Sequence, residues 1–63
     1  MNIRELRKKA HLTQDQLAGK MNVSRSTVAM WEIGAIMPNT KKLPALAVAL
    51  GVTVDALFQE ETV

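Results

Sequence analysis

The sequence of 63 residues contains no cysteine, a single histidine and only two aromatic residues, one Trp and one Phe. Without cysteine the chain forms no disulfide and no thiolate metal site, and a reducing cytoplasm is the compartment we expect. The sequence also lacks a glycine-rich phosphate loop and a carboxylate pair suited to acid–base catalysis. A domain this short leaves little room for a concave pocket. We therefore expect no enzyme, no metal and no cofactor.

Long apolar runs are absent as well. The longest, residues 43–50, is interrupted by Pro44 and is far shorter than the roughly 20 residues that span a bilayer. The N-terminal segment MNIRELRKKA is charged and periodic, which is unlike a signal-peptide core. A single domain of this size buries only about 60% of its unfolded surface. Its core must therefore come from well-packed helices or from a partner chain.

The charged residues are unevenly distributed. All eight Lys and Arg lie in residues 1–42, where three acids leave a net charge of +5. Residues 43–63 carry three acids and no basic residue, for a net charge of −3. This asymmetry indicates a face made for an anionic partner, although an uneven solubilising surface explains it equally well.

Capping patterns predict where the helices begin and end. Thr13, followed three residues later by Gln16, has the spacing of a capping box, and Asn2 with Glu5 has the same spacing. Two more N-caps are Ser24 and Thr53. Helix ends are predicted at residues that suit a left-handed backbone, namely Asn22, Gly34 and Gly51. His11, at the end of the first helix, is expected to cap carbonyls or to be solvated.

Between each predicted helix start and the helix end that follows it, apolar residues recur at helical spacing and form one stripe. The fold class predicted is all-α, a compact five-helix bundle with helices near residues 2–11, 13–21, 24–33, 41–50 and 53–58. Residues 60–63 are predicted to be a frayed tail. The predicted core residues are Ile3, Leu6, Ala10, Leu17, Ala18, Met21, Val28, Trp31, Leu43, Leu46, Ala47 and Leu50. Gly19, inside the second helix, costs roughly 1 kcal/mol relative to Ala, and such a glycine often permits the close approach of another element.

The second and third helices are joined by about three residues around Asn22, so they must cross at a steep angle. This is the geometry of a helix-turn-helix unit, whose second helix can enter a DNA major groove about 12 Å wide. With Val28 and Trp31 packed inward, the outward residues of the third helix are Arg25, Ser26, Ala29 and Met30.

Each of these outward residues suits a base edge. Arg25 can donate two parallel hydrogen bonds to guanine, Ser26 can donate or accept, and the apolar Ala29 and Met30 suit a thymine methyl group. Free amides at the helix start, with the Thr27 hydroxyl beside them, suit phosphate oxygens. The alternative is an ordinary solvated helix face, which gives no reason for a Ser-Arg-Ser-Thr run.

The segment TQDQLAGKMNVSRSTVAMWEIG resembles the core of the lambda-type (Xre/Cro-like) helix-turn-helix family. The segment LPALAVALGVTVDALF resembles the fourth and fifth helices of the same lambda repressor-like DNA-binding domain, and the likeness covers roughly residues 2–58. The resemblance implies a sequence-specific regulator of transcription that binds double-stranded DNA. It further implies a repressor that acts in the cytoplasm of a bacterium and is encoded by the bacterium or a phage.

The resemblance also implies roles for individual residues. Base contacts are implied for Arg25, Ser26 and Met30. Phosphate contacts are implied for Gln14, Ser24, Thr27, Lys41 and Lys42. Glu32 matches a family acid that pairs with a basic residue of the first helix, here Arg7, so its role is structural. Met30 stands where the family often has a polar residue. Ile36 and Met37 stand where basic or polar residues are common, which weakens a phosphate contact or marks an apolar contact with another subunit.

A single domain contacts few base pairs, so we expect a homodimer, at least on DNA, with half-sites about one helical turn apart. The dimer surface is predicted at Met37, Pro38, Val54 and Leu57, with the core as the alternative place for Leu57. The alternative function is a protein-interaction module of the same fold, antitoxin-like or a bridging subunit, in which Ile36, Met37 and the acidic tail matter most. We expect neither a membrane contact nor a small-molecule ligand. A complete small regulator and the N-terminal part of a longer one both fit the sequence.

Overall fold

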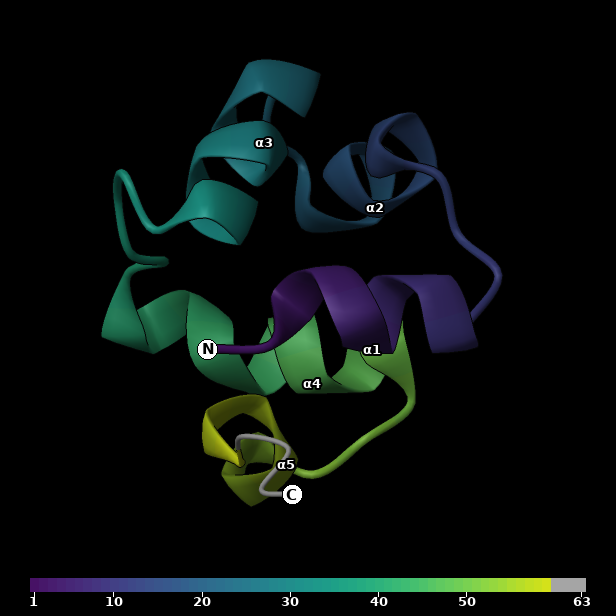
Figure 1. Cartoon of the computed structure of the whole chain (residues 1–63), viewed down its shortest axis with the longest axis vertical. Coiled ribbons are helices and arrows are strands. Elements are labelled where there is room, and N and C mark those ends of the chain that lie inside the picture. Colours follow the sequence, from purple (N-terminus) through teal and green to yellow (C-terminus); the bar gives the residue numbers. More distant parts are fainter. Residues whose placement is uncertain (60–63) are drawn as a thin grey trace.

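The computed structural model describes residues 1–59, and every regular element among them is helical. The elements are α1 (Ile3–Lys9), α2 (Gln14–Met21), α3 (Arg25–Ile33), the 3-10 turn η1 (Thr40–Lys42), α4 (Leu43–Leu50) and α5 (Val54–Phe58). In Figure 1, α2 and α3 lie at one end of the molecule, α1 and α4 cross its middle, and α5 lies at the other end. The all-α prediction of five helices is confirmed. The predicted tail, residues 60–63, lies outside the described residues.

The hydrophobic core draws on all five helices. Its members are Ile3, Leu6, Leu17, Ala18, Met21, Val28, Trp31, Leu46, Ala47, Leu50 and Leu57. All but Leu57 belong to the predicted apolar stripes, while the predicted Ala10 and Leu43 are only half-buried. The core therefore fixes which face of each helix is left for a partner. Within residues 1–59, no helix has the length and apolar character needed to cross a membrane.

The helices α1 to α4 end in the same way. Each is followed by a residue with positive φ, namely His11, Asn22, Gly34 and Gly51. The next backbone amide then returns to a carbonyl five residues earlier, as from Leu12 to Arg7 at 3.1 Å and from Val23 to Ala18 at 3.0 Å. This is the Schellman arrangement, which satisfies carbonyls that the helix end leaves free. It ends α1 at Lys9, two residues before the predicted end.

Side-chain caps begin three of the helices as predicted. Thr13 Oγ1 accepts from Gln16 N at 3.0 Å, and Gln16 Oε1 accepts from Thr13 N at 2.8 Å, which completes a capping box. Ser24 and Thr53 also accept an amide hydrogen bond with their hydroxyl oxygens. An unpredicted cap, Asn39, accepts from Lys41 N at 2.9 Å and begins η1, so α4 begins at Leu43 rather than at residue 41.

The predicted capping box at Asn2 and Glu5 is wrong. Asn2 has φ −107° and ψ 44°, whereas the three working caps have an extended backbone, so its side chain makes no capping hydrogen bond. Its backbone N–H instead donates to the carbonyl of Leu57 at 3.3 Å. Asn2 Oδ1 is buried and has no hydrogen-bond partner within the described residues. The N-terminus is therefore tied to α5 through its backbone.

Candidate nucleic-acid interface

A three-residue turn connects α2 to α3. Asn22 adopts the left-handed conformation with φ 57°, Val23 packs against the core, and Ser24 caps α3. A left-handed residue at this point turns the chain sharply without breaking the packing of either helix. The turn therefore fixes α3 across α2 and sets which α3 side chains point outward.

The outward face of α3 carries the predicted base-reading residues. Arg25 and Ser26 are exposed, Met30 is 40% exposed, and Ala29 is half-buried. Arg25 makes no hydrogen bond or ion pair with any residue from 1 to 59, so its guanidinium is available to a ligand. Val28 and Trp31, on the other side of α3, are buried in the core.

The first turn of α3 combines two hydroxyl groups. Ser24 Oγ accepts from Thr27 N at 3.1 Å and lies 2.9 Å from Thr27 Oγ1, in a hydrogen bond that either oxygen can donate. Whichever hydroxyl donates, the other retains its proton for an external acceptor. The helix start thus presents one hydroxyl donor together with its remaining free amides.

Glu32 connects α3 to the two preceding helices. Its Oε2 accepts from Arg7 Nε at 2.6 Å, and its Oε1 accepts from Arg7 Nη2 at 3.3 Å and from Gln14 Nε2 at 3.2 Å. The Arg7 Nη1 donates to the carbonyl of Leu12 at 2.8 Å. The ion pair implied by the family resemblance is present, and its Arg7 and Glu32 side chains are only 12% and 4% exposed. The contact from Gln14 was not predicted.

Burial raises the pKa of the Glu32 carboxyl. The hydrogen bonds from Arg7 and Gln14, with the charges of Arg7 and Arg4, outweigh burial and hold this pKa below its ordinary value of 4.5. Glu32 is therefore ionised at neutral pH, and the Arg7 charge compensates it. An acid so placed does not repel an anionic partner at the nearby surface.

The starts of α2 and α3 face one shallow hollow of about 260 Å³. It is lined by Arg7, Leu12, Thr13, Gln14, Asp15 and Arg25. The structure thus brings the predicted phosphate ligand Gln14 close to the predicted base reader Arg25. Gln14 gives one amide hydrogen to Glu32 and keeps the other for a ligand. Asp15 also lines the hollow. The sequence patterns did not predict it as a site residue, although it directly follows the predicted phosphate ligand Gln14.

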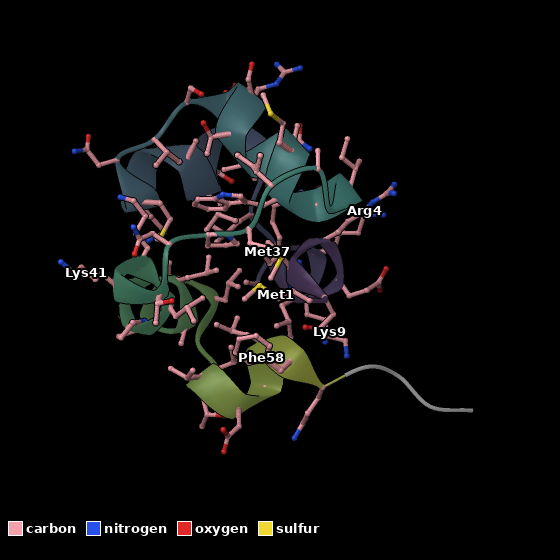
Figure 2. All side chains as sticks on the ribbon, turned by 90° about the vertical axis from the view of Figure 1, so that its left-hand side faces the viewer. Met1, Arg4, Lys9, Met37, Lys41 and Phe58 are labelled. Atoms are coloured by element: carbon pink, nitrogen blue, oxygen red, sulfur yellow. The ribbon has the colours of Figure 1, made fainter. Side chains whose placement is uncertain are left out.

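The other predicted phosphate ligands lie apart from this hollow. Lys41 is exposed and Lys42 is half-buried, and both belong to η1. Figure 2 shows Lys41 on the opposite side of the molecule from Arg4. Neither lysine lines the hollow at the start of α2.

The predicted dimer surface needs correction at two residues. Leu57 is fully buried in the core and Pro38 is also buried, so neither can contact another subunit in this fold. Met37 and Val54 are exposed as expected, and Phe58, which was missed, is 53% exposed. Figure 2 shows Met37 and Phe58 on one face. The signal for Phe58 was its spacing of four from Val54, which places both on one side of α5.

Within the described part of the chain, no group of three or more His, Cys, Asp or Glu side chains is placed so that it could hold a metal ion. What the geometry defines is a helix-turn-helix unit whose second helix carries an exposed arginine. The chain belongs to the helix-turn-helix family, which it matches over residues 3–57.

Three curated relatives share most of this chain. It is 47% identical over 60 residues to the immunity repressor protein of Bacillus phage phi105, an alignment covering 95% of this chain and 42% of the relative. It is 37% identical over 59 residues to the HTH-type transcriptional activator BcrR of Enterococcus faecalis, an alignment covering 94% of this chain and 29% of the relative. It is 31% identical over 61 residues to the uncharacterized HTH-type transcriptional regulator YqaE of Bacillus subtilis (strain 168), an alignment covering 97% of this chain and 53% of the relative. The chain spans about half or less of these relatives, whose names describe regulators of transcription and not enzymes.

Proposed function

We propose that the protein is a sequence-specific transcriptional regulator that binds double-stranded DNA and reads the major groove with α3. The observation that carries this proposal is the exposed Arg25, which is unbonded within residues 1–59 and stands at the start of α3 above the hollow that Gln14 lines. A base-reading donor and a phosphate donor therefore lie side by side. The names of the relatives support regulation, and the name of the phage immunity repressor favours repression. In this proposal the protein acts in the cytoplasm of a bacterium.

The proposed contacts divide into two kinds. Base edges are read by Arg25, Ser26, Ala29 and Met30. Backbone phosphates are held by Gln14, Ser24, Thr27, Lys41 and Lys42. Arg25 carries most of the sequence preference, because a guanidinium can form two parallel hydrogen bonds with guanine. Ala29 is half-buried and contributes only apolar contact.

The protein binds its site as a homodimer, in this proposal through the exposed apolar residues of one face. Met37 and Phe58 lie on that face (Figure 2), exposed Ile36 neighbours Met37 in the chain, and exposed Val54 lies one helical turn from Phe58 on α5. Large apolar side chains grouped at a surface indicate a protein contact. A twofold pair would place the two copies of α3 in successive major grooves about one helical turn apart.

A second candidate function, a protein-interaction module, is favoured by the same apolar face. In that case the face would bind a different chain and Arg25 would have no nucleic-acid role. Salt separates the two functions, because phosphate contacts weaken steeply with salt while apolar contacts change little.

Selection of bound duplexes from a random pool at about 100 mM salt tests the proposal, because phosphate contacts still contribute at that ionic strength. The expected product is an inverted repeat with half-sites about one turn apart. Recovery of no motif by the folded protein would favour the protein-interaction module.

The first mutational prediction concerns Arg25. Arg25→Ala should weaken binding to the selected site by about 1–3 kcal/mol and relax the preference at one base pair. Gln14→Ala is the matched comparison and should weaken all duplexes alike. Titration of a small panel of duplexes with single base-pair changes measures both effects. An unchanged preference in Arg25→Ala would refute the proposed docking of α3.

A further inference from the structure

A second hollow, of about 290 Å³, lies where α1 meets the start of α2 and the end of α3. It is lined by Arg4, Arg7, Gln14, Ala29, Glu32 and Ile33. We propose that this hollow binds one phosphate group of the DNA backbone and that Arg4 supplies the positive charge that holds it. The inference rests on the proposed function, since it adds a phosphate contact on α1 to the interface described above.

The charged residues that line the hollow, Arg4, Arg7 and Glu32, carry a net charge of +1, and the charge of Arg4 acts on Glu32 without a close contact. Arg7 and Glu32 neutralise one another through their ion pair. Arg4 is exposed and forms no hydrogen bond or ion pair within residues 1–59. The hollow therefore carries one uncompensated positive charge, which matches the single negative charge of a phosphodiester.

The hydrogen-bonding groups that line the hollow are mainly donors. Arg7 uses three of its five N–H groups on Glu32 and Leu12, so two remain. Gln14 lines both hollows, and its one remaining amide hydrogen is already assigned to the phosphate beside Arg25, whereas Arg4 retains all of its donors. The carboxylate of Glu32 already accepts from Arg7 and Gln14 at both oxygens. A ligand with several acceptor oxygens and one negative charge fits this set.

The position of the hollow relative to α3 fits the DNA backbone rather than a base. Its α3 residues, Ala29 and Ile33, continue the outward face that Ser26 begins. The nine residues of α3 give a length of about 13 Å, close to the roughly 12 Å width of a major groove. A helix of that length in the groove brings both of its ends near the phosphates that border it. In this arrangement the hollow with Arg25 lies near the phosphates at the first end of α3, and the hollow with Arg4 lies near the phosphates at the second end.

Figure 2 shows Arg4 pointing outward from α1, on the side away from Lys41. Lys41 is therefore unable to bind the same phosphate as Arg4. Arg4 thus widens the proposed footprint on DNA rather than duplicating a contact already assigned.

The test is the salt dependence of binding to the duplex that the wild-type protein selects. If Arg4 holds one phosphate, Arg4→Ala should reduce the slope of log K against log salt by about 0.9. The matched control is Lys20→Ala, which removes the same charge from an exposed position that lines neither hollow. Its slope should stay close to that of the wild type. Circular dichroism of each variant confirms folding, since both side chains are exposed.

Equal slopes for Arg4→Ala and the wild type would overturn the inference while leaving the proposed function intact. The same holds if Lys20→Ala lowers the slope as much as Arg4→Ala, because general charge then explains the loss. If the wild type shows no salt-dependent binding to any duplex, the proposed function fails and the inference falls with it.

A free phosphate ion has the same chemistry as the backbone group, so a second measurement separates the two sources. Thermal unfolding without DNA is compared in sodium phosphate and in sodium chloride of equal ionic strength. We expect no phosphate-specific rise in the melting temperature that depends on Arg4. A rise in the wild type that Arg4→Ala abolishes, together with equal salt slopes on DNA, would assign the hollow to a small anion and overturn the backbone assignment.

Discussion

At Glu32 one carboxylate accepts hydrogen bonds from two helices other than its own. Arg7 of α1 and Gln14 of α2 both donate to it, so the three helices nearest the proposed DNA surface meet at a single side chain. Removing the carboxylate would leave the guanidinium of Arg7, only 12% exposed, without its counter-charge. An unpaired charge of this kind is far more costly than the intact pair is favourable.

The depressed pKa of Glu32 predicts a dependence of stability on pH. The pKa is lower in the folded chain than its ordinary value of 4.5, so ionised Glu32 stabilises the fold fully above that value. This stabilisation is lost as the pH falls below 4.5 toward the folded pKa. Urea unfolding midpoints measured between pH 7 and pH 3 should therefore fall at the acid end. Glu32→Gln is the control, and a decline just as steep in that variant would contradict the assignment.

Gly19 carries a second prediction at the residue scale. It lies within α2, and a Cβ placed there would meet no atom within 4 Å, so the expected close approach of another element is absent from the fold. Gly19→Ala should then stabilise the protein by about 1 kcal/mol, because alanine has the higher helix propensity. In a domain this small the melting temperature should rise by about 4–8 °C. Destabilisation would mean that the space around Gly19 is needed for the fold.

The individual helices differ in how they begin, and paired substitutions test this difference. Thr13→Ala should cost about 1 kcal/mol, because it removes a working cap. Asn2→Ala should cost no comparable amount, because Asn2 makes no capping bond and its buried Oδ1 is unpartnered in the described structure. Chemical unfolding of the two variants side by side gives the comparison. An equal loss from both would show that Asn2 caps α1 in solution.

Sequence patterns predicted the elements well where the signal is local. Thr13 with Gln16, and the glycine at 34, act within one helical turn, so their effect can be read from spacing alone. His11 was missed as a left-handed residue because positive φ is uncommon for any residue except glycine, although histidine adopts it more often than most. Asn2 failed as a cap because a backbone bond to the distant Leu57 accompanies a different local conformation. Contacts of that range are not visible in a capping pattern.

At the scale of the whole molecule, Leu57 and Phe58 are neighbours in the chain, but Leu57 belongs to the core and Phe58 to the surface proposed for dimerisation. Leu57→Ala should cost about 2–5 kcal/mol as a fully buried side chain is truncated. The total stability of a domain this size is about 3–9 kcal/mol, so much of that variant should be unfolded. Phe58→Ala should keep the fold and weaken dimerisation on DNA. Circular dichroism and sedimentation of the protein–duplex complex measure the two effects, and unfolding of Phe58→Ala would contradict the surface assignment.

The candidate site could be predicted only in part from the sequence, because some of its contacts join residues that are far apart in the chain. The outward position of Arg25 and Ser26 follows from helical spacing once Val28 and Trp31 are placed inside. The bond between Gln14 and Glu32 and the hollow beside Arg4 depend on how three helices pack, which no local pattern encodes. Pro38 and Leu57 were assigned to the surface because apolar residues near a loop fit a core and an interface equally well.

Trp31 is the only tryptophan in the chain and lies in the core with 5% of its surface exposed. Its indole is therefore a built-in fluorophore on the inner side of the same helix whose outer side is proposed to meet DNA. Unfolding should move its emission to the red as water reaches the ring, whereas a ligand on the outer face should leave the wavelength nearly unchanged. One emission spectrum thus separates a variant that has lost its fold from one that has lost only its DNA contacts, without any attached dye.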